Sequence, residues 1–236
     1  MRLEIVAVAG LPEIRPGDDL AAFIRGVDAS VVVAIAQKIV SKAEGAIVDL
    51  REIQPSALAR AWAEEWNKDA RLVELILAQS RRIVKMERGV IISETRHGFV
   101  CANAGVDQSN IEGEHFATIL PDDPDASARR LHASLGCGAV IITDTFGRPW
   151  REGLVDVAIG VAGLQALDDY RGRTDRHGRK LASTILATAD QLAAAAGLVM
   201  RKEAGCPVAL IRGFEWQPAE GSAQSLLRKP AQDLFR

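Results

Sequence analysis

Acidic and amide side chains gather in a short segment that follows an apolar run. Residues 103–110 read Asn-Ala-Gly-Val-Asp-Gln-Ser-Asn. Asp107 could act as a ligand for a hard cation, with Asn110 contacting a phosphate or a ribose, because Mg²⁺ and Mn²⁺ prefer oxygen ligands. Asp and Asn in a glycine-containing loop are also ordinary turn formers, since their side chains bond nearby backbone groups. On the residues alone, turn formation is the favoured interpretation.

A second segment places an acidic residue directly after an apolar run. Residues 140–143 lead into Asp144 and Thr145, and Arg148 and Arg151 follow in the same stretch. Ligands often bind where the strands of a mixed sheet end, which makes Asp144 and Thr145 candidate oxygen ligands of a metal. The guanidinium groups have the fork geometry that binds anionic oxygens. The alternative is a turn-forming Asp with solvated arginines, and the residues leave both interpretations open.

Two further segments carry basic residues beside glycine. Residues 37–45 contain Lys38 and Lys42, which could neutralise phosphates. The segment is not a P-loop, because GxxxxGK[ST] is absent from the chain, and two solvated lysines in an exposed loop are the favoured interpretation. Residues 200–207 leave an Ala-rich helix, where basic side chains suit the helix dipole and Gly205 and Pro207 act as stop signals.

The elements that must position these segments alternate irregularly between strands and helices. Apolar and β-branched runs predict strands at 3–8, 31–36, 47–50, 140–143, 155–159 and 208–211, and a meander over 83–101 that turns at Gly89 and Gly98. Cap residues and helical spacing predict helices at 18–26, 56–66, from 69 onward, at 125–135 with Asp125 as its cap, and over 181–200. A regular βαβ succession is not seen, so the fold class is mixed α+β with packed helices.

Composition argues against several classes of protein. The chain has 236 residues and a formal net charge of −2, which argues against a nucleic-acid binder. The three cysteines show no CxxC spacing, which predicts neither a disulfide framework nor a zinc site and fits a reducing cytoplasm. Asp190 lies at the centre of the apolar run 181–200 and argues against a membrane span. We expect one domain over 1–213 and a polar, partly disordered tail over 214–236.

Four segments together, 10–20, 37–45, 103–110 and 142–153, resemble the coenzyme F420-0:L-glutamate ligase (F420-0:gamma-glutamyl ligase) family in order and spacing. The resemblance covers residues 1–213. It implies a fold particular to the family, an intertwined homodimer, and a ligase that uses GTP and divalent metal ions. GTP would phosphorylate the terminal carboxylate of F420-0, the amine of L-glutamate would attack the acyl phosphate, and further rounds would extend a gamma-linked oligoglutamate tail.

Carried over by position, the resemblance also implies the site residues. The nucleotide would contact Leu11, Pro12, Glu13, Ile14, Gln37, Lys38, Lys42, Asn110, Met200, Arg201, Lys202, Glu203, Ala204, Gly205 and Cys206. Two Mg²⁺ or Mn²⁺ sites would be built from Asp107, Asp144, Thr145 and Glu203, with Lys202 the competing match for the last position. Asp107 and Asp144 would be the catalytic pair, and a monovalent cation such as K⁺ could also bind.

Two positions depart from the family pattern. A glycine is usual where Arg201 stands, and a tyrosine is common at His177. These departures motivate a rival hypothesis, a paralogous ligase with a different acid or amino-acid substrate. A second rival is a catalytically silent GTP-binding regulator, against which the retained Asp107 and Asp144 argue. We expect a cytoplasmic protein that binds neither nucleic acid nor membrane.

Overall fold

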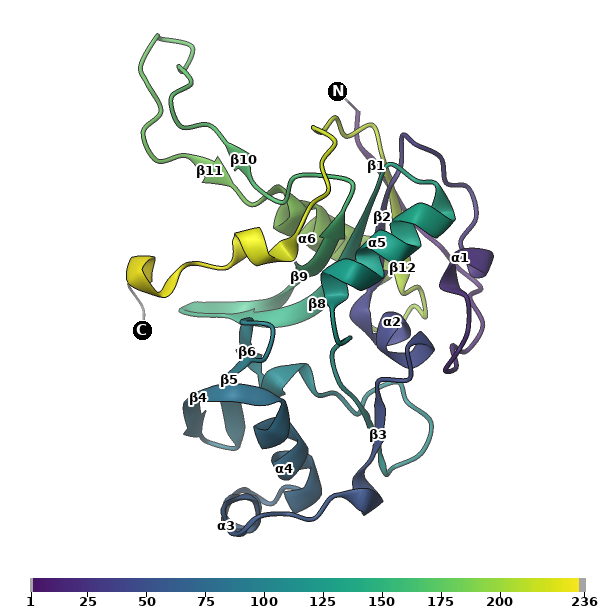
Figure 1. The fold of residues 1–236 in the computed structure, drawn as a ribbon, viewed down its shortest axis with the longest axis vertical. Helices are drawn as coiled ribbons and strands as arrows, with labels where there is room; N and C mark the ends of the chain where they lie inside the picture. The colour runs from purple at the N-terminus through teal and green to yellow at the C-terminus, as the bar shows by residue number, and fades with distance from the viewer. Residues whose placement is uncertain (1, 234–236) are drawn as a thin grey trace.

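A five-stranded sheet forms the centre of the molecule (Figure 1). The computed structural model describes residues 2–233. The strand order is β1 (Glu4–Ala7), β12 (Val208–Arg212), β2 (Val32–Ala36), β8 (Ala139–Arg148) and β9 (Arg151–Ala162). β2 and β8 are parallel, and the other neighbours are antiparallel. β2 is a continuous apolar run because the sheet is covered on both faces.

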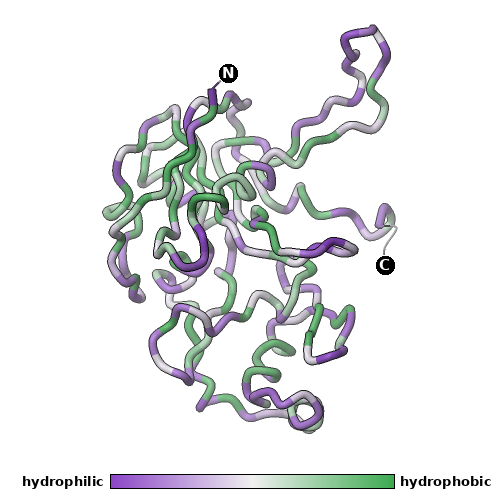
Figure 2. Tube along the Cα trace, turned by 180° about the vertical axis from the view of Figure 1, so that it is seen from behind, coloured by the Kyte–Doolittle hydropathy of each residue, from purple (hydrophilic) through white to green (hydrophobic). Residues whose placement is uncertain are grey.

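Helices cover the two faces of this sheet. α5 (Pro124–Leu135) lies on one face and α6 (Thr188–Met200) on the other (Figure 1). α5 can approach β9 closely because Gly160 has no side chain: a Cβ there would lie 2.4 Å from the carbonyl oxygen of Pro124. α1 (Leu20–Phe23) and α2 (Gln37–Ala43) are short, and α2 follows β2 directly. Figure 2 shows hydrophobic residues concentrated along the strands of the central sheet.

A second hydrophobic core lies within the long connection from β2 to β8, which we call the insert lobe (residues 47–118). It contains a pair of strands, a pair of helices and a three-stranded meander, with 3₁₀ turns at Leu50–Glu52 and Asn103–Gly105: β3 (Ile47–Asp49), β7 (Phe116–Thr118), α3 (Ala57–Trp66), α4 (Ala70–Gln79), β4 (Ser80–Glu87), β5 (Val90–Thr95) and β6 (Val100–Ala102). Trp62, Ile76 and Ile91 are buried in this core. The lobe therefore forms a second body beside the central sheet (Figure 1).

The mixed α+β class is confirmed, and so are most of the predicted elements. Ser56 and Asp69 cap α3 and α4, each accepting a hydrogen bond from a backbone N–H of the first turn. The prediction that Asp125 caps α5 is wrong. Asp123 accepts from Ala126 N (2.9 Å), and Pro124 takes the first helical position, where no N–H is needed.

Several boundaries also differ from prediction. Residues 37–45 were expected to be a loop, but Gln37–Ala43 is helical. β8 continues past Thr143 to Arg148 because β9 pairs with it along that length. α1 ends at Phe23 rather than at residue 26. α6 begins at Thr188 rather than 181, because β11 (Ile185–Leu186) pairs with β10 (Asp168–Asp169) and keeps the preceding residues extended.

The internal segment 168–187 and the described part of the C-terminal tail differ in how they pack. Residues 168–187 form an arm that projects from the sheet (Figure 1). The described part of the tail packs on the central core: Ala223 is buried, Trp216 Nε1 donates to Gly163 O (3.1 Å), and 3₁₀ turns occur at Ala223–Leu226 and Pro230–Gln232. The division at residue 213 stays a prediction, and the last part of the expected tail, 234–236, lies outside the described residues. Within 2–233, no helix is long and apolar enough to cross a membrane.

Candidate functional site

A cavity of about 940 Å³ opens at the carboxyl end of β2, between the central sheet and the insert lobe. Its volume is typical of sites that bind small molecules. All four segments singled out in the sequence contribute to its wall. The lining includes Leu11, Pro12, Glu13, Ile14, Gln37, Lys38, Lys42, Asp107, Asn110, Asp144, Thr145, Met200, Arg201, Lys202, Glu203, Gly205 and Cys206.

Three residues considered in the sequence lie away from this wall. Ala204 is not among the residues that line the cavity. Arg148 and Arg151 lie further out on the β8–β9 hairpin, where Arg148 Nη2 donates to Glu152 O (2.5 Å). Neither arginine faces the cavity, so the structure gives them no part in binding an anion there.

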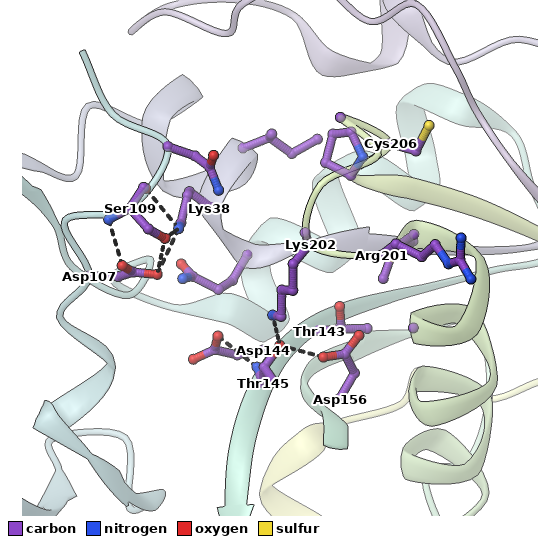
Figure 3. A pocket seen from close by; sticks show the side chains of 18 of the residues that line it. Lys38, Asp107, Ser109, Thr143, Asp144, Thr145, Asp156, Arg201, Lys202 and Cys206 are labelled. Atoms are coloured by element: carbon purple, nitrogen blue, oxygen red, sulfur yellow. Dashed lines mark hydrogen bonds and ion pairs between the residues drawn. The ribbon is translucent and has the colours of Figure 1, made fainter. Parts of the chain in front are cut away.

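An ion pair joins α2 to the insert lobe at one side of the cavity (Figure 3). Lys38 Nζ donates to Asp107 Oδ2 (2.6 Å), to Ser109 Oγ (2.6 Å) and to Ser109 O (2.8 Å). Burial acts to raise the pKa of Asp107, but the hydrogen bonds from Lys38 and Ser109 outweigh it and hold the pKa below its usual value. Asp107 also accepts from Ser109 N (2.7 Å), so it makes the expected turn while its charge faces the cavity.

Lys42 is almost fully enclosed. Its side chain is 7 % exposed and donates to Glu13 Oε1. The interpretation of Lys38 and Lys42 as solvated loop lysines is therefore wrong, because both belong to α2 and Lys38 is only 17 % exposed. Gln37 is buried beside them and accepts from Ser41 Oγ (2.8 Å). The ammonium groups of Lys38 and Lys42 are thus both fixed by ion pairs on one wall of the cavity.

Asp144 is a partly buried carboxylate on β8. Ala36, the last residue of β2, pairs with Thr143, so Asp144 lies just beyond the end of the parallel pair although β8 itself continues. Its Oδ1 accepts from Thr145 N (2.8 Å), and among the described residues no lysine or arginine forms an ion pair with it. Burial raises the pKa of Asp144 to about 7, and the nearby charge of Asp107 acts in the same direction.

Thr145 stands at the centre of a short hydrogen-bonded chain (Figure 3). Lys202 Nζ donates to Thr145 Oγ1 (2.5 Å), and Thr145 Oγ1 donates to Asp156 Oδ1 on β9. Arg201 points away from this group in Figure 3. Its backbone has φ 45° and ψ 156°, a conformation that favours glycine.

These oxygen atoms suit a divalent metal ion. Asp144 is a partly buried carboxylate that forms no ion pair with a described residue, and the nearby charges of Lys202 and Lys38 do not offset the effect of its burial. Asp107 lies close enough to affect it, and Thr145 adds a hydroxyl. Such a hard-oxygen set fits Mg²⁺ or Mn²⁺, which commonly take one or two carboxylates and complete their shell with water and phosphate oxygens. Within 2–233 there is no group of three or more His, Cys, Asp or Glu side chains arranged to hold a metal ion. The family resemblance left the last metal-ligand position open between Glu203 and Lys202. Of these two residues, Lys202 makes the hydrogen bond to Thr145.

Sequence reasoning missed three kinds of lining residue. Ser109 shares the ammonium of Lys38, Asp156 accepts from Thr145, and Leu154 and Leu198 form an exposed apolar edge. Asp156 could have been found, because it is a charged residue within the apolar run 155–159. The apolar edge gave no signal, since single leucines are ordinary on protein surfaces.

Comparison with known proteins identifies the family. The sequence profile of the F420-0:Gamma-glutamyl ligase family matches residues 10–213. The chain is 46% identical to the coenzyme F420:L-glutamate ligase of Methanothermobacter thermautotrophicus over 100% of both chains. It is 47% identical to that of Methanopyrus kandleri, covering 95% of this chain and 94% of the relative, and 42% identical to that of Methanocaldococcus jannaschii, covering 87% and 84%. Since the profile and the relatives agree over nearly the whole length, the chain belongs to the F420-0:gamma-glutamyl ligase family.

Proposed function

We propose that this protein joins L-glutamate to coenzyme F420-0 in a reaction that consumes GTP and requires Mg²⁺ or Mn²⁺. The relatives support the acid and the amine, because they are named coenzyme F420:L-glutamate ligases. The observation that carries the proposal is that Asp144 and Asp107 line one cavity, close enough for their charges to interact, together with Lys38, Lys42 and Lys202. Such a wall combines sites for a hard cation and for phosphate oxygens.

The proposed chemistry has two steps. An oxygen of the acid's carboxylate attacks the γ-phosphorus of GTP, the bond from that phosphorus to the bridging oxygen breaks, and GDP leaves. The nitrogen of L-glutamate then attacks the acyl carbon, phosphate leaves, and the amine loses its proton. A carboxylate is a poor acyl donor, and phosphorylation supplies the leaving group that it lacks.

The residues of the cavity would bind and orient these reactants. Lys202 Nζ is held at Thr145 with no ion pair among the described residues, so its charge is available to a phosphate oxygen. Lys38 is oriented by Asp107 and Ser109, which keeps its ammonium at the cavity wall. Asp107, Asp144 and Thr145 would hold the metal, whose charge would offset repulsion between the triphosphate and an anionic substrate.

A mass-spectrometric end-point assay tests the proposal. Purified protein is incubated with GTP, Mn²⁺ or Mg²⁺, L-glutamate and F420-0, and the product mass is recorded. We expect a gain of one or more glutamyl residues that requires both GTP and metal, and loss of that gain in Asp107→Asn and Asp144→Asn. Glutamylation that proceeds without GTP, or full activity in both variants, would contradict the proposal.

We also propose a homodimer. The projecting arm is a two-stranded hairpin, which is marginally stable on its own. Leu154 and Leu198, at one edge of the cavity, are 67% and 76% exposed, and Trp150 at the turn of the β8–β9 hairpin is 79% exposed. Large exposed apolar side chains of this kind mark interaction surfaces when they gather in a patch. Light scattering coupled to gel filtration should give twice the chain mass; a monomer at micromolar concentration would refute the dimer.

A further inference from the structure

Asp156 contacts Thr145, a proposed metal ligand, and the family resemblance assigned no role to it. It lies on β9 directly opposite Thr145 on β8, and both line the cavity. Thr145 Oγ1 donates to Asp156 Oδ1. A carboxylate can only accept and an ammonium can only donate, so the direction of both hydrogen bonds at Thr145 is fixed by the chemistry of its neighbours.

The consequence for Thr145 is a fixed hydroxyl orientation. The single hydrogen of its hydroxyl is given to Asp156, and a lone pair faces Lys202 Nζ at 2.5 Å. With its only hydrogen given to Asp156, Thr145 offers lone pairs alone to a cation in the cavity, and one of them accepts from Lys202. A hydroxyl with a free hydrogen could instead donate into the cavity and repel a metal ion.

The packing of α6 holds Asp156 in place. Gly197 lies against the carboxylate, since a Cβ on that residue would come within 2.4 Å of Asp156 Oδ2 and 3.0 Å of its Cγ. One carboxylate oxygen is therefore turned toward Thr145 and the other toward the helix. This arrangement differs from that of Asp144, whose carboxylate has only the backbone N–H of Thr145 as a described hydrogen-bond donor.

We infer that Asp156 is a positioning residue that orients the Thr145 hydroxyl as an oxygen ligand for a divalent cation. The inference rests on the proposed function, because it takes the metal site of that proposal as its target. Residues that orient a metal ligand commonly contribute 10–100-fold to metal affinity. Asp156→Ala should therefore weaken Mn²⁺ binding at least about tenfold, although Asp156 itself need not touch the ion.

The test is a Mn²⁺ titration of the full chain with a non-hydrolysable GTP analogue, in which the electron paramagnetic resonance signal reports free Mn²⁺. The variants are Asp156→Ala, Thr145→Val and their combination, with Asp156→Asn as the conservative change that keeps an acceptor oxygen. Asp190→Ala is the matched control, because Asp190 also ties α6 to β9, by accepting from Ala158 N (2.9 Å), yet does not line the cavity. Circular dichroism and melting temperature confirm that each variant folds.

We expect Asp156→Ala to bind Mn²⁺ about tenfold more weakly than wild type and Asp156→Asn to recover most of that loss. In the Thr145→Val background, Asp156→Ala should cause no further weakening, since its partner is gone. The inference is overturned if Asp156→Ala binds as tightly as wild type, if Asp190→Ala weakens binding equally, or if the loss persists in the Thr145→Val background. Failure of wild type itself to bind Mn²⁺ overturns the inference together with the metal requirement of the proposed function, whereas normal binding in Asp156→Ala overturns the inference alone.

Discussion

Replacing Asp144 with Asn should make the metal-free protein more stable at pH 8 while removing its response to Mn²⁺. The side chain keeps its shape but loses a charge that the fold disfavours. The pKa of Asp144 is raised from 3.8 to about 7, first by burial and then by Asp107. Each pKa unit is equivalent to about 1.4 kcal/mol, which sets an upper bound of roughly 4 kcal/mol on the free energy involved.

The sign follows from the order of the two pKa values. Between pH 4 and 7 the folded protein keeps the proton of Asp144 and the unfolded chain does not, so this group's contribution to stability falls as the pH rises. Below pH 4 both states carry the proton, and Asn resembles that neutral form. The difference in unfolding free energy between Asp144→Asn and wild type should thus be near zero at pH 4 and rise to about 2–4 kcal/mol at pH 8, once relaxation around the charge is allowed for.

Urea unfolding in EDTA, followed by circular dichroism from pH 4 to pH 8, measures this difference directly. Other titrating groups are common to both proteins and largely cancel in the subtraction. In EDTA-free buffer at pH 8, free Mn²⁺ at a hundredfold excess over its dissociation constant should stabilise wild type by about 2.7 kcal/mol and leave Asp144→Asn unchanged. A variant that is less stable than wild type at pH 8, or a difference that does not depend on pH, would refute the burial argument.

Three further predictions concern other parts of the fold. Gly197→Ala should destabilise wild type because of its contact with Asp156, yet stabilise Asp156→Ala by about 1 kcal/mol through helix propensity; equal effects in both backgrounds, measured by thermal unfolding, would contradict the contact. Asp125→Ala should lower the free energy of unfolding by about 3 kcal/mol, measured in urea, because it leaves two buried backbone N–H groups without an acceptor: Val161 N and Ala223 N, which donate to Asp125 at 2.8 and 2.9 Å. Asp168→Ala is the control, because Asp168 is not fully buried, and an equal loss there would count against the explanation. Arg201→Gly should raise stability by about 1 kcal/mol by relieving its backbone conformation, and an unchanged melting temperature would argue against strain.

The helix boundaries could be predicted from the sequence only where a capping residue marks the first turn. Ser56 and Asp69 indicate where α3 and α4 begin, because side chains of these types accept hydrogen bonds from the first turn of a helix. α2 has no such signal, because the residue at its N-cap position, Ala36, has no side chain that can accept a hydrogen bond, and the segment therefore resembles a loop. At α5, the preference of proline for the first helical position makes Pro124 the first helical residue and Asp123, not Asp125, the cap.

The cavity could be predicted only in part. The four segments named its principal residues because order and spacing resembled a family, and they do line one cavity. Asp156 was missed because its role depends on which residue of β8 lies opposite it. That pairing is set by the hairpin turn and by the register shift between Gly147 and Arg148, which short-range patterns do not reveal.

The parallel pairing of β2 with β8 has a consequence for how this protein folds. It joins Val32 to Ala139 across the whole insert lobe, and closing so long a loop costs entropy before any contact compensates. Contacts this distant in sequence slow folding, whereas the helices and meander of the lobe are local and can form early. Lys38, Asp107 and Asp144 come from before, within and after the lobe, so they meet only when that late pairing closes. During refolding, affinity for nucleotide should therefore appear after most of the helical signal has returned, and a nascent chain that has not yet emerged beyond β8 carries no site.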